Sequence, residues 1–302
     1  MLAIGKAGDE IGTGSLTVID TEFINNEINS EGPGDLRGGA LYGFAMPDIT
    51  ISGSVFTGNI GSNGGAVGGL GSSFRIVSTS FFDNRTNGTG PSGSLEGHGG
   101  AISLDAVTQN GVTGYLESGA VWYWTHEGAL TVTNTTFADN ACFANDTGMG
   151  GAVAISRGLA DFIHCTIARN WAEFHGGGIQ MCGDCDIGMQ SCLFYQNTSD
   201  RDGGWAKFQI NRAADRDLGG NLQYLSEDLV IDSNSDALVS ENAVRADPQV
   251  LDLADNGGPT LTMALPTGSP ALDAGATDNA PAADQRGLPR DATPDVGAFE
   301  LQ

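Results

Sequence analysis

The sequence predicts an all-β protein, a solenoid of the parallel β-helix type, and three observations support this prediction. An apolar residue, usually Phe, is followed three positions later by Asn at six places along the 302-residue chain. A Gly-Gly pair follows each of these Asn residues, and most pairs lead into a short apolar stretch. The two signals alternate strictly, and no helical periodicity accompanies them. We therefore expect each repeat to form one coil that stacks on the previous one.

Three short strands are expected in each coil. The positions seven and five residues before each repeated Phe or Ile are mostly apolar, and they lie two apart, as on a strand with one buried face. A second strand is expected at the repeated Phe, whose side chains should stack in the core. A third is expected after the Gly-Gly pair, as in "GGALYG" and "GGAISL".

The repeated Asn residues are predicted to form a ladder in which side-chain amides bond from coil to coil. The distance from a Gly-Gly pair to the next Phe or Ile is nearly constant, whereas the distance from Asn to Gly-Gly varies from 5 to 15 residues. One corner of the coil is therefore variable. The expected ladder consists of Asn26, Asn59, Asn84, Asn140, Asn170 and Asn197.

One interval between repeats is longer than the others, 38 residues from Gly99 to Phe137. It contains "SGAVWYW" at 118–124, which reads as a degraded Gly-Gly strand, so we expect a hidden coil there. The glycine-rich stretch at 54–69 could instead suggest a phosphate loop. No Gly-Lys-Ser/Thr and no helical pattern follow it, so we interpret it as the shortest repeat.

The "GGA[ILV]" and "FxxN" signatures over residues 16–204 resemble the repeats of bacterial polymorphic outer membrane proteins. The resemblance implies a right-handed parallel β-helix of the kind found in passenger domains of surface adhesins. Function does not follow from this fold alone, because β-helices host adhesins, lyases, hydrolases and structural spikes.

The motifs "DNGGPT", "GSPALDAG", "DQRGLPR" and "PDVGAFE" within residues 253–300 resemble the choice-of-anchor Q domain of bacterial secreted surface proteins. We expect this segment to cap the open end of the β-helix, whose unpaired strand edges would otherwise invite aggregation. The predicted organisation is therefore β-helix repeats over 1–210, followed by terminal coils and a C-terminal cap over 211–302.

The charge and hydropathy of the chain indicate which classes of binding partner are not expected. The net charge is −24, which disfavours nucleic acid and anionic membranes. The sequence has no apolar run long enough for a transmembrane helix, so direct membrane insertion is not expected. The start "MLAIGKAGDE" lacks the apolar core of a signal peptide, so an exported protein would have its leader missing here. An extracellular or cell-surface location is expected.

Cysteine pairing stays open. Cys182 and Cys185 form a C-x-x-C, which fits a small local disulfide, a zinc half-site or free thiols. Cys165 and Cys192 occupy equivalent small-residue positions two before the repeated apolar residue, so they should be neighbours across one coil, as members of a small-residue ladder or, alternatively, as a disulfide. No metal site is predicted; calcium held by Asp-rich loops is an alternative.

Catalytic candidates are few, and each has a solvated-surface alternative. Asp83 and Asp139 precede ladder Asn residues and could form a carboxylate pair as in glycosidases. Lyases need a base and a cation, for which Arg85 and Arg169 lie directly beside ladder positions and His175 precedes a glycine corner.

Tryptophans near the variable corner suggest a carbohydrate platform, with packing under long loops as the alternative. These residues are Trp122, Trp124, Trp171 and Trp205. We expect a surface protein with an adhesive or structural role that binds a polysaccharide or cell-surface glycan through loops at the variable corner. The alternatives are a polysaccharide lyase or glycoside hydrolase, and a filament subunit that self-associates.

Overall fold

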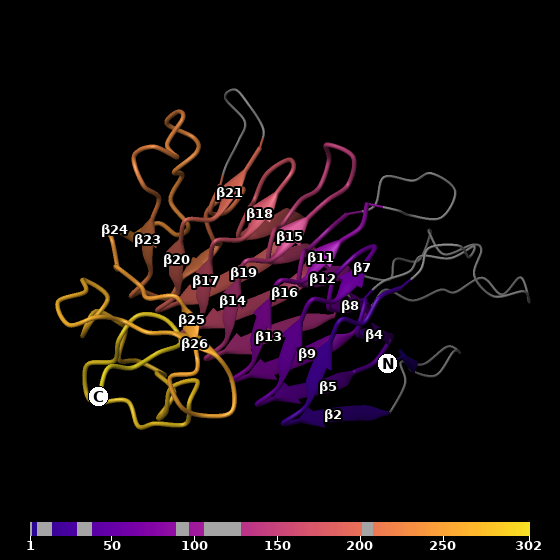
Figure 1. Ribbon diagram of the computed structural model, residues 1–302, viewed down its shortest axis with the longest axis horizontal. Helices are drawn as coiled ribbons and strands as arrows, with labels where there is room; N and C mark the ends of the chain where they lie inside the picture. Colours follow the sequence, from indigo (N-terminus) through magenta and orange to yellow (C-terminus); the bar gives the residue numbers. More distant parts are fainter. Residues whose placement is uncertain (1, 5–13, 29–37, 89–96, 106–127, 201–207) are drawn as a thin grey trace, which may run out of the picture.

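The computed structural model describes residues 2–4, 14–28, 38–88, 97–105, 128–200 and 208–302. The regular elements in these ranges are all β-strands, and nearly all strand pairs are parallel. Three sheets of 11, 8 and 5 strands, called A, B and C, run side by side along the molecule (Figure 1). The middle coils of the chain add strands to all three sheets, whereas the coils of β3 (Glu22–Ile24), β23 (Leu222–Tyr224) and β24 (Val244–Arg245) add none to sheet C. The all-β, parallel architecture is compatible with a β-helix-like fold, as the alternating motifs predicted.

Sheet A has two tracks of short strands that merge into two long ones. The first track consists of β1 (Leu2–Ile4) and of three strands that follow Gly-Gly pairs, β4 (Leu41–Phe44), β8 (Val67–Leu70) and β12 (Ile102–Asp105). The second track precedes the repeated Phe: β2 (Ser15–Ile19), β5 (Asp48–Ser52), β9 (Ser73–Val77) and β13 (Ala129–Thr133). The remaining strands are β16 (Val153–Ile163), β19 (Ile179–Gln190) and β22 (Arg216–Asp217), and β16 pairs with both β12 and β13.

Sheets B and C are built from shorter strands. Sheet B consists of β3 (Glu22–Ile24), β6 (Val55–Thr57), β10 (Ser80–Phe82), β14 (Thr136–Ala138), β17 (Thr166–Ala168), β20 (Leu193–Tyr195), β23 (Leu222–Tyr224) and β24 (Val244–Arg245). Sheet C consists of β7 (Ile60–Gly61), β11 (Arg85–Thr86), β15 (Ala141–Cys142), β18 (Trp171–Ala172) and β21 (Thr198–Ser199). The antiparallel pair β25 (Leu253–Ala254) and β26 (Thr262–Met263) lies outside these sheets.

The prediction of a hidden coil before Phe137 is wrong. Strand β10 pairs directly with β14, and the rings of Phe81 and Phe137 stack with centroids 5.0 Å apart. The extra residues, 106–127, are an insertion between β12 and β13 within one coil. The motif "SGAVWYW" lies outside the described residues. An insertion between two strands of one coil lengthens the interval between repeats without adding a layer to the stack, so spacing alone could not separate the two cases.

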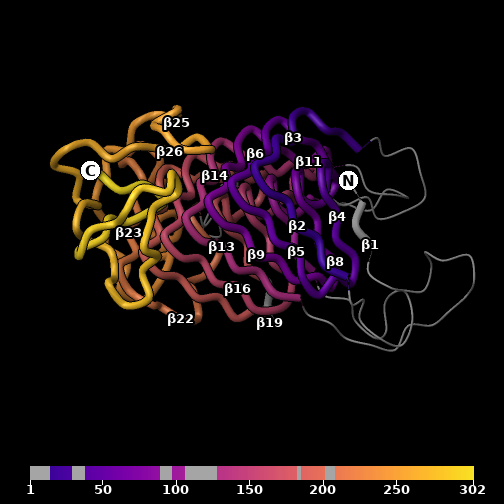
Figure 2. Tube along the Cα trace, turned by 90° about the horizontal axis from the view of Figure 1, so that it is seen from below, coloured from indigo at the N-terminus to yellow at the C-terminus, as the bar shows by residue number. Residues whose placement is uncertain are grey.

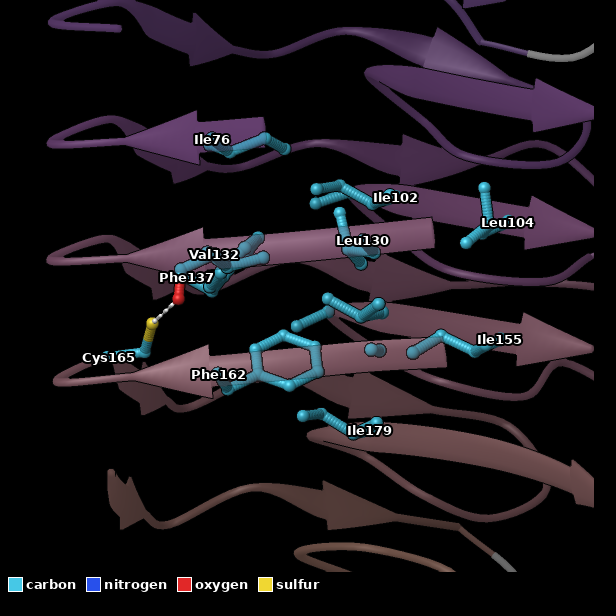
Figure 3. Packing of buried hydrophobic residues seen from close by; sticks show 14 of the residues in the cluster. Ile76, Ile102, Leu104, Leu130, Val132, Phe137, Ile155, Phe162, Cys165 and Ile179 are labelled. Carbon is cyan, nitrogen blue, oxygen red and sulfur yellow. Dashed lines mark hydrogen bonds between the residues drawn. The ribbon is translucent and has the colours of Figure 1, made fainter. Parts of the chain in front are cut away.

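The core is a column of in-register apolar side chains. Ile76, Val132 and Phe162 face each other through the register of β9, β13 and β16, and Figure 3 shows them one above another. The rings of Phe23, Phe56 and Phe81 stack at 4.5 and 4.8 Å between centroids. Because each core residue contacts its equivalents in the adjacent coils, the same residue type recurs and the period is visible in the sequence.

The predicted asparagine ladder (Asn26, Asn59, Asn84, Asn140, Asn170 and Asn197) is present, and every step follows one pattern. The Oδ1 of Asn140 accepts from both the backbone N–H (3.0 Å) and Nδ2 (3.0 Å) of Asn84. Its Nδ2 donates onward to Oδ1 of Asn170 (2.9 Å) and back to the carbonyl of Phe81 (3.0 Å). The interior amides are fully buried, and these bonds satisfy them. At the last step Asn197 donates to Oε1 of Gln209, a terminating residue that the repeat did not reveal.

The corner between sheets A and B explains the small residues that precede each repeated Phe. Thr135 Oγ1 donates to the carbonyl of Thr133 (3.0 Å), and Cys165 Sγ lies 3.5 Å from the carbonyl of Ile163. Such a bond to the residue two before closes a local turn and requires a short donor side chain. The residue between the two partners is left-handed in every coil. We call these positions the flank corners: Asp20, Gly53, Ser78, Asn134, His164 and Ser191, with φ between 47° and 56°.

The Gly-Gly pairs combine two separate requirements. The first glycine has positive φ, as at Gly64 (73°) and Gly176 (68°). The second lies against the next coil, where a Cβ on Gly65 would come within 2.1 Å of the carbonyl oxygen of Gly100. In the "FHGGG" coil the sequence spacing suggested the pair Gly177-Gly178, whereas this pattern selects Gly176 and Gly177.

The C-terminal segment, residues 247–302, lies along the side of the stack (Figures 1 and 2). Its Met263 packs on Ala138 and Ala168 on the outside of sheet B. Its polar contacts reach four successive flank corners from Ser78 to Ser191. We expected this segment to cover the open end of the stack. Its main contact surface is instead the side of the stack. The end receives residues such as Val239, which is fully buried in the core column.

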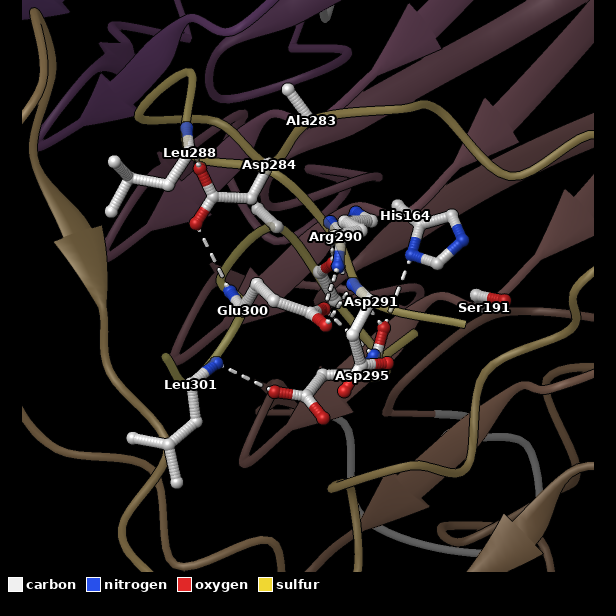
Figure 4. A network of polar contacts seen from close by, with 12 residues as sticks. His164, Ser191, Ala283, Asp284, Leu288, Arg290, Asp291, Asp295, Glu300 and Leu301 are labelled. Atoms are coloured by element: carbon white, nitrogen blue, oxygen red, sulfur yellow. Dashed lines mark hydrogen bonds and ion pairs between the residues drawn. The ribbon is translucent and has the colours of Figure 1, made fainter. Parts of the chain in front are cut away.

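The motifs of this segment form a buried ionic network (Figure 4). Arg290 pairs with Glu300 at 2.8 Å, and both side chains are only 2% exposed. Arg290 also donates to Oδ1 of Asn134, which couples the network to a flank corner. Asp284 pairs with Arg286, whose guanidinium stacks 3.8 Å over the ring of Phe299. Buried charges are tolerated when they are paired and hydrogen-bonded, which accounts for the density of charged residues in "DQRGLPR" and "PDVGAFE".

His164 lies at the junction of the coils and this network. Its Nδ1 is 3.1 Å from the carbonyl of Asp295, and the ring is fully buried. Burial, and secondarily the charge of Arg290, lower the pKa of His164 to about 3. The imidazole is therefore neutral at physiological pH and acts as a fixed contact between the segment and the stack.

Candidate functional site

Two of the predicted catalytic residues and a predicted cation meet at the corner between sheets B and C. Asp83, Asp139 and Arg169 each precede a ladder Asn, and their φ values of 56°, 55° and 55° place them in the same left-handed position of three successive coils. We call these three residues the carboxylate row. Because their backbones stack in register through sheet B, side chains from the three coils lie side by side.

Arg169 is held mainly by Asp139. Its Nε and Nη2 donate to the two carboxylate oxygens of Asp139, both at 2.8 Å, in a bidentate pair. Its Nη1 reaches Asp252 of the C-terminal segment at 3.1 Å, but that carboxylate is 98% exposed, so this contact adds little. The sequence pattern did not point to Asp252, which has no equivalent in other coils.

The electrostatics of the row perturb the carboxyl group of Asp83. Burial, followed by the neighbouring charge of Asp139, raises the pKa of Asp83, while Arg169 acts in the opposite direction. Asp83 can therefore keep a proton at higher pH than an ordinary Asp. A carboxyl that keeps its proton is one of the two groups that acid-catalysed glycoside cleavage requires.

A second group lies around the corner, on the outer face of sheet C. We call it the outer strip: Ile60, Arg85, Ala141, Trp171 and Thr198, which are in register across five strands. Arg85 is thus two strands from Trp171 and faces away from the core. Of the predicted candidates, the strip contains Arg85 and Trp171.

Trp171 is the centre of an aromatic and acidic group. Its ring packs on Phe143 with centroids 4.8 Å apart and planes tilted by 51°. Its Nε1 donates to Oδ1 of Asp200 at 2.7 Å, and Phe143 is 38% exposed. Nearby, Glu173 accepts from the backbone N–H groups of Ala144 (2.5 Å) and Asp146 (2.9 Å), which orders the loop that carries Phe143. Phe143, Glu173 and Asp200 belong to the variable corner, so no repeat signal could identify them.

The remaining predicted residues do not join either group. His175 is half-buried, and its Nδ1 lies 2.7 Å from Oε1 of Gln180. Trp122, Trp124 and Trp205 lie outside the described residues, so the larger tryptophan platform stays a prediction.

The cysteine predictions are met only in part. Cys165 and Cys192 are fully buried thiols on adjacent coils, as their equivalent spacing predicted. Cys185 is buried, with Sγ 3.0 Å from the carbonyl of Ile155, while the side chain of Cys182 lies outside the described residues. Within the described ranges, no three or more His, Cys, Asp or Glu side chains are grouped to hold a metal ion. The alternative of calcium binding stays a prediction.

Comparison with known proteins does not add to these observations. No protein-family model matches the chain, and no curated protein matches it significantly. Among the described residues, no helix is long and apolar enough to span a bilayer.

Proposed function

We propose that this protein is a right-handed parallel β-helix of the bacterial surface type that binds glycans along the outer strip of sheet C. The fold part of the proposal is supported by the recurrence of parallel strands in three sheets, one coil after another. The hand is supported by the general rule that connections between parallel strands of one sheet are almost always right-handed. The resemblance of the repeats and of the C-terminal motifs to exported surface proteins supports the location.

The observation that carries the binding proposal is the pair formed by Trp171 and Phe143 on an outward-facing strip. Sugar rings stack on exposed aromatic faces through their C–H groups, and carboxylates accept hydrogen bonds from sugar hydroxyls. Asp200, bonded to the indole, supplies such an acceptor, and Arg85, two strands along, supplies N–H donors. A strip of in-register strands presents these groups on a long straight surface, which suits an extended chain of sugars.

A glycan array followed by titration of the strongest ligand tests this function. We expect Trp171→Ala and Phe143→Ala each to weaken binding by about tenfold. Each change removes apolar contact area whose burial contributes about 1.4 kcal/mol or more to the binding free energy. Tyr224→Ala is the matched control, since Tyr224 lies on the outside of sheet B. Absence of any glycan ligand for the intact protein, or equal loss in all three variants, would contradict the proposal.

A polysaccharide hydrolase or lyase is the second candidate, and the carboxylate row favours it. The pKa of Asp83 is raised, as an acid catalyst requires in direction, and Asp139 is the adjacent carboxylate. Two features oppose this candidate: Arg169 occupies both oxygens of Asp139, and Asp83 lies on an exposed corner.

Assays for new reducing ends and for unsaturated products across a polysaccharide panel decide between the two functions. Turnover that Asp83→Asn abolishes would establish the enzyme and reject a purely binding role. Binding without turnover, retained in Asp83→Asn and lost in Trp171→Ala, is the result that we expect.

A further inference from the structure

Three residues with metal-binding side chains occupy one register position on successive coils. His98, Met149 and His175 each immediately precede the first glycine of a Gly-Gly corner. Parallel bridges join His98 to Met149 and Met149 to His175. We call these residues the His–Met–His row. The sequence showed the two histidines beside glycine corners, but only the register places the methionine between them.

The backbone fixes the spacing of this row. The carbonyl of each member accepts a hydrogen bond from the glycine N–H one coil earlier: Gly64 to His98 (2.8 Å), Gly99 to Met149 (2.9 Å) and Gly150 to His175 (3.2 Å). Parallel in-register residues are about 4.8 Å apart, and their side chains project from the same face. The backbones of the two histidines therefore lie about 5 Å on either side of the methionine, so that ligand atoms on three long side chains could meet at one ion.

The surroundings bury part of the row and orient one of its rings. All three residues are half-buried, and Nδ1 of His98 is a buried atom. Gln180, only 4% exposed, holds Nδ1 of His175 through its amide oxygen at 2.7 Å. Fixing one ring nitrogen by a buried hydrogen bond directs the other, Nε2, to the opposite side of the ring, as the second-sphere partners of metal-bound histidines do.

We propose that His98, Met149 and His175 form a binding site for a soft monovalent metal ion, Cu(I), with two imidazole nitrogens and one thioether sulfur as ligands. Thioether and imidazole donors suit Cu(I), whereas hard cations such as Ca²⁺ and Mg²⁺ prefer oxygen ligands. A structural Zn²⁺ site would require four ligands, usually thiolates and imidazoles. The row offers three neutral donors, which favours a cation of low charge.

The neighbouring thiol is not part of the proposed ligand set. Cys142 is fully buried behind the row, with Sγ near the carbonyls of Gly97 (3.0 Å) and Met149 (3.3 Å). The thiol is thus held by two backbone carbonyls inside the core, apart from the imidazole and thioether donors. A Cys142→Ser variant therefore separates a thiol site from the His–Met–His row.

The test is anaerobic titration of the full chain with Cu(I), in competition with a chromophoric Cu(I) chelator. We expect one equivalent to bind, Ag(I) to displace it, and Zn²⁺ at the same concentration not to displace it. Met149→Leu, His98→Gln and His175→Gln should each weaken binding by at least about tenfold, and Gln180→Leu by about tenfold through loss of orientation.

Cys142→Ser and Trp171→Phe should bind Cu(I) as the intact protein does, and circular dichroism shows whether each variant keeps its β content. No stoichiometric Cu(I) binding by the intact protein would overturn the proposal. So would binding that survives Met149→Leu and both histidine variants, or binding that only Cys142→Ser removes.

Discussion

The asparagine ladder and the C-terminal segment both bury polar groups, but they satisfy them in opposite ways. In the ladder one residue type repeats, and every amide bonds to its equivalents in the coils before and after. In the C-terminal segment each polar group has a different partner, and the partners are far apart in sequence, such as Arg290 and Asn134. The ladder contains neutral amides, whereas the segment contains ion pairs that are almost fully buried.

This difference predicts how each region fails. A ladder step is shared by neighbouring coils, so its loss should destabilise the whole stack. The network of the segment lies on the side of the stack, and its loss should release the segment while the coils stay folded. In both regions the free energy at risk comes from groups left buried without a partner.

The largest effect is expected from Asn140→Leu in the middle of the ladder. The change removes the acceptor for Asn84 and the donors to Phe81 and Asn170, all buried. At about 1–3 kcal/mol for each unsatisfied group, we expect a loss of about 5 kcal/mol or failure to fold. Urea unfolding followed by circular dichroism measures it. Asn26→Leu, at the exposed start of the ladder, is the matched control and should cost less than about 1 kcal/mol.

A smaller and local effect is expected from Arg290→Met. This change leaves Glu300 charged and buried, which typically costs about 3–5 kcal/mol. Limited proteolysis should then cut within residues 247–302 while the coils stay resistant. Adding Glu300→Gln should restore part of the stability. If proteolysis instead degrades both regions together, they form one cooperative unit and the contrast between them fails.

The third effect is pH-dependent and tests the junction of the two regions. The pKa of His164 is about 3 in the folded protein and about 6.5 when unfolded, so the unfolded chain takes up the proton first. The free energy of unfolding should show no loss from His164 above pH 6.5. It should fall as the pH drops toward 3, and His164 should account for a loss of about 3 kcal/mol at pH 4.

The variant His164→Asn should remove this loss of stability at low pH. Asn is chosen because it occupies the preceding flank corner, at Asn134. The raised pKa of Asp295 contributes with the opposite sign, but it is present in both proteins, so their difference isolates the histidine. Parallel curves of stability against pH for the two proteins would show that His164 does not titrate as described.

Sequence periodicity could predict what repeats and little else. The Phe column and the asparagine ladder were predictable because each residue contacts its own equivalents. Gln209 was not, because a terminating residue occurs once and belongs to a different residue type. The flank corners share a backbone conformation but differ in residue type, so the sequence does not identify them as contacts of the C-terminal segment. The insertion at 106–127 lengthens the spacing of the repeats in the same way as an additional coil would.

The two regions also place different limits on how such a chain can change in length. A coil inserted anywhere in the ladder restores every amide bond, because the donor and acceptor pattern is the same at each step. The C-terminal segment, in contrast, contacts the flank corners from Ser78 to Ser191 in a fixed order. Its contacts therefore fit only one number of coils between these two residues. Duplication of a coil before Ser78 leaves these contacts intact, whereas duplication between Ser78 and Ser191 shifts them. We therefore expect the number of coils to vary at the N-terminal side and to stay constant where the C-terminal segment contacts the stack.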